Sequence, residues 1–560
     1  MNDTSYDLVP LKAPRTAGWL LKTTAALLEQ RFPGHAIAEK LLRDVGIQRF
    51  RDAPCSDPLL QVHPLFSDGP APPHSGPCQP PSDSVAPPDE YPFQSAWALS
   101  RAYREGRTTP VKVAERLIEH LTNTEATPTP LGAIISMKAD EIISQGQSAT
   151  ERYAQGTPIG PLDGVPVGVK DELDQTGFPT TVGTGFLGTH PAVEDATVVA
   201  RLRAAGALLI GKLNMHEIGI GVTGINPHHG AARNPYNRRH MTGGSSSGSG
   251  SAVGMGLCPI AVGADGGGSI RIPASLCGVV GLKATYGRIS EHGAAPLCWS
   301  VAHVGPLGAT VYDVALAYAI MAGPDPFDLH TRYGPEVDLN DLSSADVHGL
   351  RIGIFEPHFQ DADDAVVESC TRAVDALCAR GARRVPIEIP QLGLLRTAHM
   401  VTIVSEMLHS MNPHLAKDRT RFGYDVRMNL ALGQRLTQAD YIKAQRMRPA
   451  LFEHFNKAFE TVDVIVTPST GCTAPLIRKD ALKTGESDLV TLDKIMRFSP
   501  AANLTGLPSI SIPVGYDDAG LPIGLQVMGP AWSESRLLKV GLCLERCTNR
   551  QAPDGYLTHV

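Results

Sequence analysis

A glycine- and serine-rich segment, residues 243–271, contains the residue types that acyl-transfer chemistry requires. It reads GGSSSGSGSAVGMGLCPIAVGADGGGSIR and places two serines, Ser245 and Ser269, among glycines. Glycine tolerates positive φ angles and lets backbone N–H groups approach a bound atom closely. The consecutive amides of residues 266–269 are therefore predicted to converge on one oxygen, as an oxyanion hole requires.

Lys170 is the predicted base for these serines. A serine hydroxyl is a weak nucleophile without a base, and neither serine cluster contains a histidine. Lys170 follows the apolar run 165–169, where burial would disfavour the charged form of its side chain. Neighbouring side chains on a strand point to opposite faces. We therefore expect Asp171 to leave Lys170 without a tight carboxylate partner and free to contact Ser245.

Each of these features has a more ordinary interpretation on its own. A lysine at a strand end is more often a surface residue. A glycine- and serine-rich loop is more often a linker or a phosphate cradle, although this one lacks the G-x4-G-K-[ST] pattern of a nucleotide P-loop. Only the combination of Lys170, Ser245 and Ser269 indicates a hydrolase.

The composition predicts a globular protein with a large core. Of the 560 residues, 42% are hydrophobic and 19% are charged, which excludes a disordered or coiled-coil protein. The net charge of −7 gives no reason to expect nucleic acid as a partner. Ten cysteines lack paired spacing, so we expect reduced thiols and a cytoplasmic location. The sequence shows no secretory or membrane-spanning segment, so we expect any membrane contact to be peripheral.

Three parts are predicted along the chain. Residues 1–53 form an N-terminal helical extension, with apolar residues at helical spacing in 14–50 and a second short helix at 36–45. This extension either packs on the main body or caps a substrate entrance or a membrane-facing patch. Residues 54–92 hold 12 of the 45 prolines and are predicted to be a linker. Residues 93–560 are expected to form the catalytic domain.

Strands and helices alternate through the catalytic part, which predicts an α/β fold with a mixed sheet. Strands are expected at 165–169, 207–210, 259–263, 351–355, 462–467 and 508–513. Helices are expected at 96–103, 111–121, 196–205 and 364–379. Residues 390–460 are mainly helical and rich in Met, Leu and His. They are core by default, and part of them could line an apolar tunnel for an acyl chain.

Together the motifs resemble those of the amidase signature family. Lys170 is followed by Gly243-Gly244-Ser245-Ser246 and by Asp265-Gly266-Gly267-Gly268-Ser269-Ile270-Arg271-Ile272-Pro273. Ser245 lies 75 residues after Lys170, and Ser269 lies 24 residues after Ser245, as in members of that family. The stretches 503–508, 513–515 and 520–526 also match, so the resemblance covers residues 93–540.

The resemblance implies the amidase signature fold, a mixed central β-sheet surrounded by helices, and roles for the site residues. Ser269 would be the acyl-forming nucleophile. Ser245, joined to Gly244 by a cis peptide bond, would relay its proton to Lys170, which is neutral in the resting enzyme. The amides of Gly266, Gly267, Gly268 and Ser269 would form the oxyanion hole, and Ser246, Asp265 and Arg271 would support it, with Arg271 paired to Asp265. No metal or organic cofactor would be needed.

Within that family, the sequence resembles the plant-type fatty acid amide hydrolases most. The resemblance rests on Asn214-Met215-His216-Glu217, Lys283-Ala284-Thr285-Tyr286-Gly287-Arg288 and Leu11-Lys12-Ala13-Pro14. It implies hydrolysis of fatty acid amides such as N-acylethanolamines, a homodimer and peripheral membrane contact. The proline-rich stretch 54–92 departs from that subgroup by being shorter and more irregular.

Three other functions stay open. The scaffold also suits amidases for short-chain or aryl amides, because pocket residues vary on it. It suits the amidase component of a tRNA-dependent amidotransferase, although Asn214-Met215-His216-Glu217 departs from the form expected there. A catalytically inactive binding protein is disfavoured, because Lys170, Ser245 and Ser269 are all present.

Overall fold

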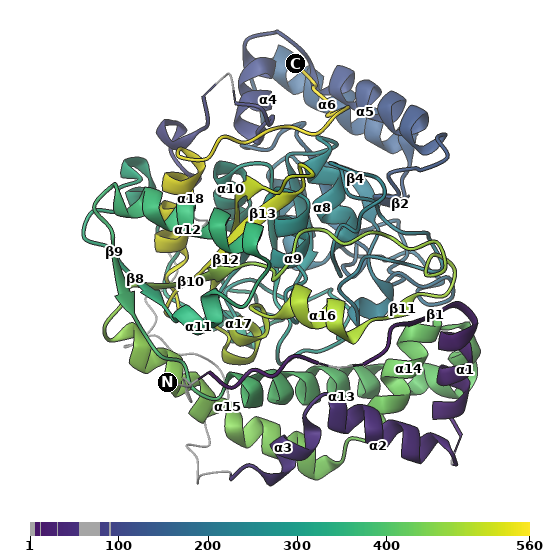
Figure 1. Cartoon of the computed structure of the whole chain (residues 1–560). Coiled ribbons are helices and arrows are strands. Elements are labelled where there is room, and N and C mark those ends of the chain that lie inside the picture. Colours follow the sequence, from purple (N-terminus) through teal and green to yellow (C-terminus); the bar gives the residue numbers. More distant parts are fainter. Residues whose placement is uncertain (1–5, 12, 31, 55–78, 89–90) are drawn as a thin grey trace.

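The computed structural model describes residues 6–11, 13–30, 32–54, 79–88 and 91–560. Most of the predicted proline-rich linker at 54–92 lies outside the described residues, so that prediction stays untested. A large sheet runs through the centre of the molecule, and helices surround it (Figure 1). No helix in the described ranges is both long enough and apolar enough to cross a membrane.

The central sheet has eleven strands within the described residues. In spatial order they are β2 Ile134–Ser136, β4 Leu208–Leu213, β3 Pro166–Lys170, β5 Ile260–Ala264, β7 Val304–Gly308, β6 Val280–Lys283, β12 Ser509–Tyr516, β13 Pro522–Met528, β10 Val464–Pro468, β8 Arg351–Ile354 and β9 Arg383–Pro386. The neighbours β4, β3 and β5 are parallel, as are β10, β8 and β9. The strands between these two groups pair antiparallel, and so does β2 at the edge. The predicted α/β fold with a mixed sheet is confirmed.

The two strands that carry the site, β3 and β5, are neighbours in this sheet. Every residue in them is buried. Strands covered on both faces appear in the sequence as continuous runs of apolar and small residues, which is why they were predicted to within a residue or two. Since parallel strands end at the same edge of a sheet, Lys170 at the end of β3 and Ala264 at the end of β5 lie close together.

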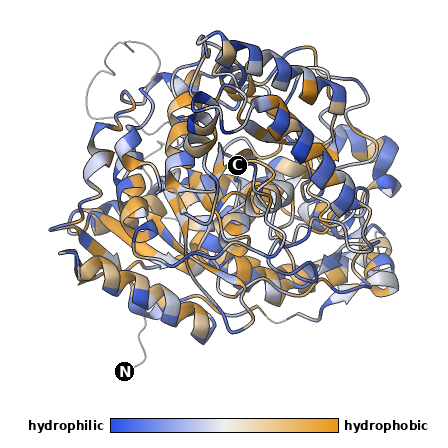
Figure 2. Cartoon of the chain, turned by 90° about the horizontal axis from the view of Figure 1, so that it is seen from above, coloured by the Kyte–Doolittle hydropathy of each residue, from blue (hydrophilic) through white to orange (hydrophobic). Residues whose placement is uncertain are grey.

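Helices surround this sheet within the described residues. They are α4 Ala96–Arg104, α5 Pro110–Glu125, α6 Ala139–Ala154, α7 Thr197–Ala204, α8 Ser247–Gly254, α9 Arg271–Leu276, α10 Val311–Met321, α11 Glu356–Phe359, α12 Asp364–Cys378, α13 Leu392–Asp418, α14 Tyr424–Gly433, α15 Gln438–Phe459, α16 Leu489–Met496, α17 Pro500–Thr505 and α18 Glu534–Glu545. The predicted helical character of 390–460 is confirmed by α13, α14 and α15. Hydrophobic residues gather on the central strands, and hydrophilic residues are frequent on the outer helices (Figure 2).

The N-terminal extension forms three helices, α1 Gly18–Leu28, α2 Gly34–Asp44 and α3 Ile47–Asp52. They lie along α13, α14 and α15, far from the N-terminus of the catalytic part (Figure 1). Leu21, Ala25 and Leu28 of α1 are buried in one cluster with Met428 and Ala431 of α14. A two-stranded sheet of β1 Thr16–Ala17 and β11 Glu486–Ser487 adds a second attachment. The extension therefore packs on the main body, and the predicted helices are confirmed.

Candidate active site

Lys170 is fully buried, so the surface position that a strand-end lysine often takes does not apply. Its Nζ atom lies 2.9 Å from Ser245 Oγ. It also lies 3.1 Å from the carbonyl oxygen of Ala264, at the end of the neighbouring strand β5. The predicted contact between the lysine and Ser245 is confirmed.

The expectation that Lys170 lacks a tight carboxylate partner is wrong. The Glu172 carboxylate lies 2.6 Å from the Lys170 Nζ. Asp171 does point away, as predicted, and lies 3.5 Å from Lys212. The chain turns where β3 ends, with the Leu173 N–H donating to the Lys170 carbonyl at 3.1 Å. Residues two apart on a strand point to the same face, so Glu172 lies on the same side as Lys170, and Asp171 points to the other side.

Ser245 is held by an unusual backbone. The peptide bond between Gly244 and Ser245 is cis, as the family resemblance implied, and Gly243 has a φ of 73°. The Ser245 carbonyl accepts a hydrogen bond from the His216 N–H at 3.0 Å. The hydroxyl of the next residue, Ser246, donates at 3.2 Å to the last carbonyl of β5. These contacts hold the first serine cluster against the strand pair that carries the lysine.

Ser269 lies in the loop between β5 and α9, and the glycines before it are required by close packing. A Cβ atom on Gly268 would lie 2.5 Å from Ile272 Cδ1, and one on Gly267 would lie 2.9 Å from His399 Cε1. Gly268 also has a φ of 121°, which residues with a side chain rarely adopt. Glycine is therefore the residue that fits at these positions.

Of the predicted oxyanion-hole amides, three are free to bind a substrate oxygen. The N–H groups of Gly266, Gly267 and Ser269 have no hydrogen-bond acceptor among the described residues. The Gly268 N–H instead donates to Asp265 Oδ1 at 2.6 Å. The expectation that Gly268 contributes a donor is thus corrected, because a buried carboxylate of the same loop already accepts that hydrogen.

Asp265 and Arg271 form the predicted pair, and both are fully buried. Arg271 Nε lies 3.0 Å from Asp265 Oδ2, and the other nitrogens reach Asn503 Oδ1 at 2.6 Å and Gln526 Oε1 at 2.7 Å. Burial alone raises the pKa of a carboxyl, but the Arg271 guanidinium holds the pKa of Asp265 well below its usual range. The charged pair thus keeps the Ser269 loop, residues 265–270 between β5 and α9, in a fixed shape.

Two residues that the sequence analysis did not single out hold the carbonyl groups of this loop. His399 Nε2 lies 2.7 Å from the Gly266 carbonyl oxygen, so this nitrogen carries the hydrogen. The Ser499 hydroxyl donates to the Gly267 carbonyl at 2.7 Å. Burial lowers the pKa of His399 to about 4, so its ring is neutral near pH 7. His399 has no local motif, whereas Ser499 lies just before the 503–508 stretch that matches the family.

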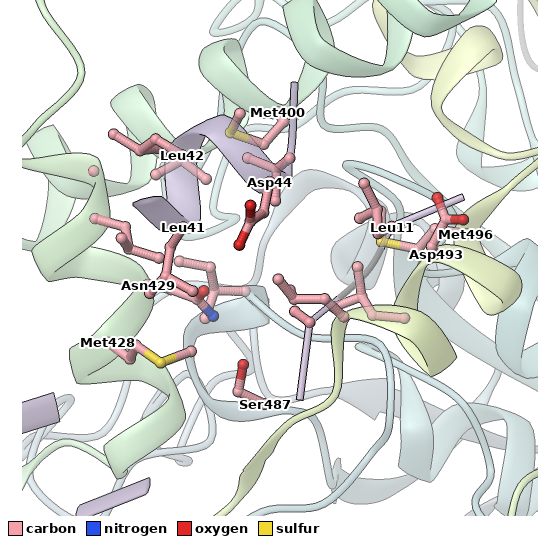
Figure 3. Close-up of a pocket in the computed structure, with 18 of the residues that line it drawn as sticks. Leu11, Leu41, Leu42, Asp44, Met400, Met428, Asn429, Ser487, Asp493 and Met496 are labelled. Atoms are coloured by element: carbon pink, nitrogen blue, oxygen red, sulfur yellow. The ribbon is translucent and has the colours of Figure 1, made fainter. Parts of the chain in front are cut away.

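An apolar pocket of about 530 Å³ opens beside Ser269. Its walls come from segments far apart in the sequence, as Figure 3 shows. The apolar residues labelled there are Leu11, Leu41, Leu42, Met400, Met428 and Met496, and the polar ones are Asp44, Asn429, Ser487 and Asp493. The N-terminal extension therefore forms part of the pocket as well as packing on the body.

Comparison with known proteins identifies the class. The family model described as Amidase matches residues 116–538, a range that includes both serine clusters and Lys170. The chain belongs to the amidase signature family, as its motifs predicted, and it is an enzyme that hydrolyses amides.

Individual relatives differ in how much of the chain they match. The fatty acid amide hydrolase of Oryza sativa subsp. japonica is 38% identical over 98% of this chain and 96% of the relative. A glutamyl-tRNA(Gln) amidotransferase subunit of Roseiflexus sp. (strain RS-1) is 36% identical over 80% of this chain and 95% of the relative. The native peptide amidase of Stenotrophomonas maltophilia superposes with a TM-score of 0.72 and 28% identity, covering 84% of this chain and all of that one. Because the match to the rice relative covers 98% of this chain, it includes most of the N-terminal extension.

Proposed function

We propose that the chain hydrolyses fatty acid amides, such as N-acylethanolamines, with Ser269, Ser245 and Lys170 as its triad. The observation that carries the proposal is the apolar pocket of about 530 Å³ beside Ser269. Pockets of this size and lining bind small molecules with large apolar parts. Similarity to the rice fatty acid amide hydrolase covers 98% of this chain, which favours the same substrate class.

The acylation step follows from the placement of the three side chains. Ser269 Oγ attacks the amide carbon while its proton passes to Ser245 and the Ser245 proton passes to Lys170 Nζ. The free amides of Gly266, Gly267 and Ser269 stabilise the resulting oxyanion. When the C–N bond breaks, the proton returns from Lys170 through Ser245 to the departing amine. The Ser269 ester that remains is then hydrolysed by water, with the same relay running once more.

The relay requires the two serine hydroxyls to approach each other. Within the described residues, Lys170 and Ser245 are hydrogen-bonded, but no hydrogen bond joins the Ser245 and Ser269 hydroxyls. Catalytic hydrogen bonds are often long without substrate and shorten when it binds. Rotation about a serine side-chain bond is a small motion, so this arrangement suits the proposed relay.

A panel of amides with one amine and increasing acyl chains tests the substrate class. We expect kcat/KM to rise from acetyl to hexadecanoyl, by up to about fourfold per methylene, because each buried methylene stabilises the complex by about 0.8 kcal/mol. A flat or falling series would overturn the fatty acid proposal and favour short-chain or aryl amides. Hydrolysis of glutamine alone would favour the amidotransferase function, which the Roseiflexus relative brings into consideration.

We also propose peripheral contact with a membrane through the N-terminal extension. Trp19 is 77% exposed and Phe32 is 82% exposed, and Leu20 beside Trp19 lines the pocket. Replacing Trp19 and Phe32 by Ser should reduce co-sedimentation with lipid vesicles. Val193→Ser is the matched control, because Val193 is 89% exposed on the catalytic part.

The predicted homodimer, cytoplasmic location and proline-rich linker at 54–92 are further parts of the proposal. Light scattering on a purified sample measures the oligomer, and fractionation of cells measures the location. Limited proteolysis that cuts first within 54–92 would support the division into an extension, a linker and a catalytic domain.

A further inference from the structure

Three groups surround the Nζ atom of Lys170, and only one of them carries a charge. They are Glu172 Oε2 at 2.6 Å, Ser245 Oγ at 2.9 Å and the Ala264 carbonyl oxygen at 3.1 Å. The lysine side chain is fully buried, and the Glu172 side chain is 7% exposed. The nearest contact of the proposed base is therefore a shielded carboxylate.

The hydrogen-bonding capacity of these groups determines which way a neutral Lys170 must face. A neutral amine has two N–H bonds and one lone pair. An ionised carboxylate and a carbonyl oxygen only accept hydrogen bonds, whereas a hydroxyl both donates and accepts. If Glu172 and Ala264 each take one N–H, the lone pair is directed at the hydroxyl of Ser245.

We propose that Glu172 is a positioning residue for the lysine base. It holds one N–H of Lys170 so that the lone pair faces the hydroxyl of Ser245. The inference rests on the proposed function, in which Lys170 takes the proton of Ser245. Glu172 acts on the reaction only through Lys170, whose Nζ atom it contacts.

The side chain of Glu172 performs this role separately from its backbone. The Glu172 carbonyl accepts a hydrogen bond from the Ala295 N–H at 2.8 Å, which anchors the turn after β3. A change of side chain leaves that bond in place. Variants at this position can therefore test the carboxylate without removing the turn.

Other titratable groups face Glu172 from the elements packed around it. Glu172 lines a second cavity of about 250 Å³, whose lining, all of it described residues, shares no member with the apolar pocket. The titratable residues that line this cavity with Glu172 are Tyr286, Glu291, His292, Asp328 and His330. Lys283, Cys298 and Glu406 lie near enough to interact electrostatically with this group of residues. Burial, Asp328 and Glu172, in that order, raise the pKa of Glu291 well above its usual range.

The rate of Ser269 labelling by a fluorophosphonate tests the proposal without requiring a known substrate. Glu172→Ala removes the acceptor oxygen and should lower the labelling rate by about tenfold or more. Glu172→Gln keeps an acceptor oxygen on a side chain of the same length, so it should restore most of the wild-type rate. Equal rates for the wild type and Glu172→Ala would overturn the proposal.

The length of the side chain gives a second prediction. Glu172→Asp keeps the carboxylate on a shorter side chain, so its acceptor oxygen no longer reaches Lys170 and labelling should be slower than in Glu172→Gln. This variant keeps the proposal testable if Glu172→Gln does not fold. A wild-type labelling rate in Glu172→Asp would remove the positioning role.

Two further variants separate this inference from the proposed function. Glu291→Gln is the matched control in the same cavity, and its labelling rate should stay close to that of the wild type, because the contacts of Lys170 are made by Glu172, Ser245 and the Ala264 carbonyl. Lys170→Ala tests the base itself. If Lys170→Ala labels as fast as the wild type, the proposed function fails. If it labels slowly while Glu172→Ala labels as fast as the wild type, only the present inference fails.

Discussion

The Ser269 loop and the N-terminal extension both border the apolar pocket, yet different kinds of contact hold them in place. Asp265 in the loop and Arg271 directly after it are fully buried and joined by charge-assisted hydrogen bonds. The extension is attached by apolar faces of its three helices, by a two-residue strand pair and by partly exposed ion pairs such as Arg15 with Glu486 at 2.7 Å. Exposed or partly exposed pairs of this kind contribute little.

We infer from this difference that the reaction and the range of substrates depend on separate parts of the molecule. Atoms that react must be held to within a fraction of an ångström, which a buried polar network can do. A pocket for an acyl chain needs only a continuous apolar surface, which distant helices can supply. Changes in the loop should therefore reduce turnover of every amide, whereas changes in the extension should act on long acyl chains alone.

The largest effect is expected for Ser269→Ala, which tests the loop directly. Loss of the nucleophile should lower kcat by about 10⁴-fold or more for all amides, since triad members act as a unit. The melting temperature should stay close to that of the wild type, because the loop hydrogen bonds described above do not use the Ser269 hydroxyl. Covalent labelling by a fluorophosphonate at any other residue would contradict the assignment.

The next largest effect is expected for Lys170→Ala, which should lower kcat for amides by about 10³-fold. An amine leaving group needs the returned proton, whereas an alkoxide needs it less, so matched esters should lose less activity. The measurement compares one acyl group as amide and as ester in wild type and variant. Near-normal amide turnover in Lys170→Ala would remove the lysine from the mechanism.

His399→Ala should lower kcat by about tenfold for acetyl and hexadecanoyl amides alike, because the Gly266 carbonyl loses its hydrogen bond. Since the pKa of His399 falls from 6.5 to about 4 on folding, the unfolded chain binds more protons between these values. The wild type should therefore lose about 3 kcal/mol of stability through this group as pH falls from 6.5 to 4.

Denaturant unfolding at pH 7 and pH 4 measures that loss, which should be absent in His399→Ala. His399→Gln is the control for turnover, because its amide can still donate to the Gly266 carbonyl. A change in kcat that differs between the acetyl and hexadecanoyl amides would show that His399 acts through the apolar pocket. It would then contradict the separation of the Ser269 loop from the part that selects the acyl chain.

The smallest effect is expected for Leu41→Ala in the extension. Removing part of the pocket wall should raise KM by about threefold to tenfold for hexadecanoyl amides, because a few buried methylene contacts are lost. The acetyl amide should show no change and serves as the internal control. Leu41→Met, which conserves volume, should stay close to the wild type. An equal loss for both substrates would mean that the extension also shapes the reacting atoms.

Much of the fold could be predicted because several central strands have a recognisable pattern in the sequence. β3 and β5 are buried on both faces, so each appears as a short run of apolar and small residues. β12 was predicted from the prolines that bound 508–513. The helices of the extension were visible from their apolar spacing. The order of the strands was not predictable, since pairing between β6 and β12 joins residues more than two hundred positions apart.

The proposed reacting residues were visible in the sequence, because a chemical motif needs particular residue types at fixed spacing. Ser245, Ser269 and the pair of Asp265 with Arg271 all lie within residues 243–271. Gly268 was assigned to the wrong partner, because the direction of one N–H depends on the local turn that Asp265 makes.

The surroundings of these residues became known only from the tertiary structure. Glu172 lies on the same side as Lys170, as residues two apart on a strand do, but only the folded chain shows that the two charged groups meet at 2.6 Å. His399 reaches Gly266 across 133 residues of sequence, and the extension reaches the pocket from the opposite end of the chain. Apolar packing is non-directional and accepts many sequences, so the contacts that it creates have no local signature.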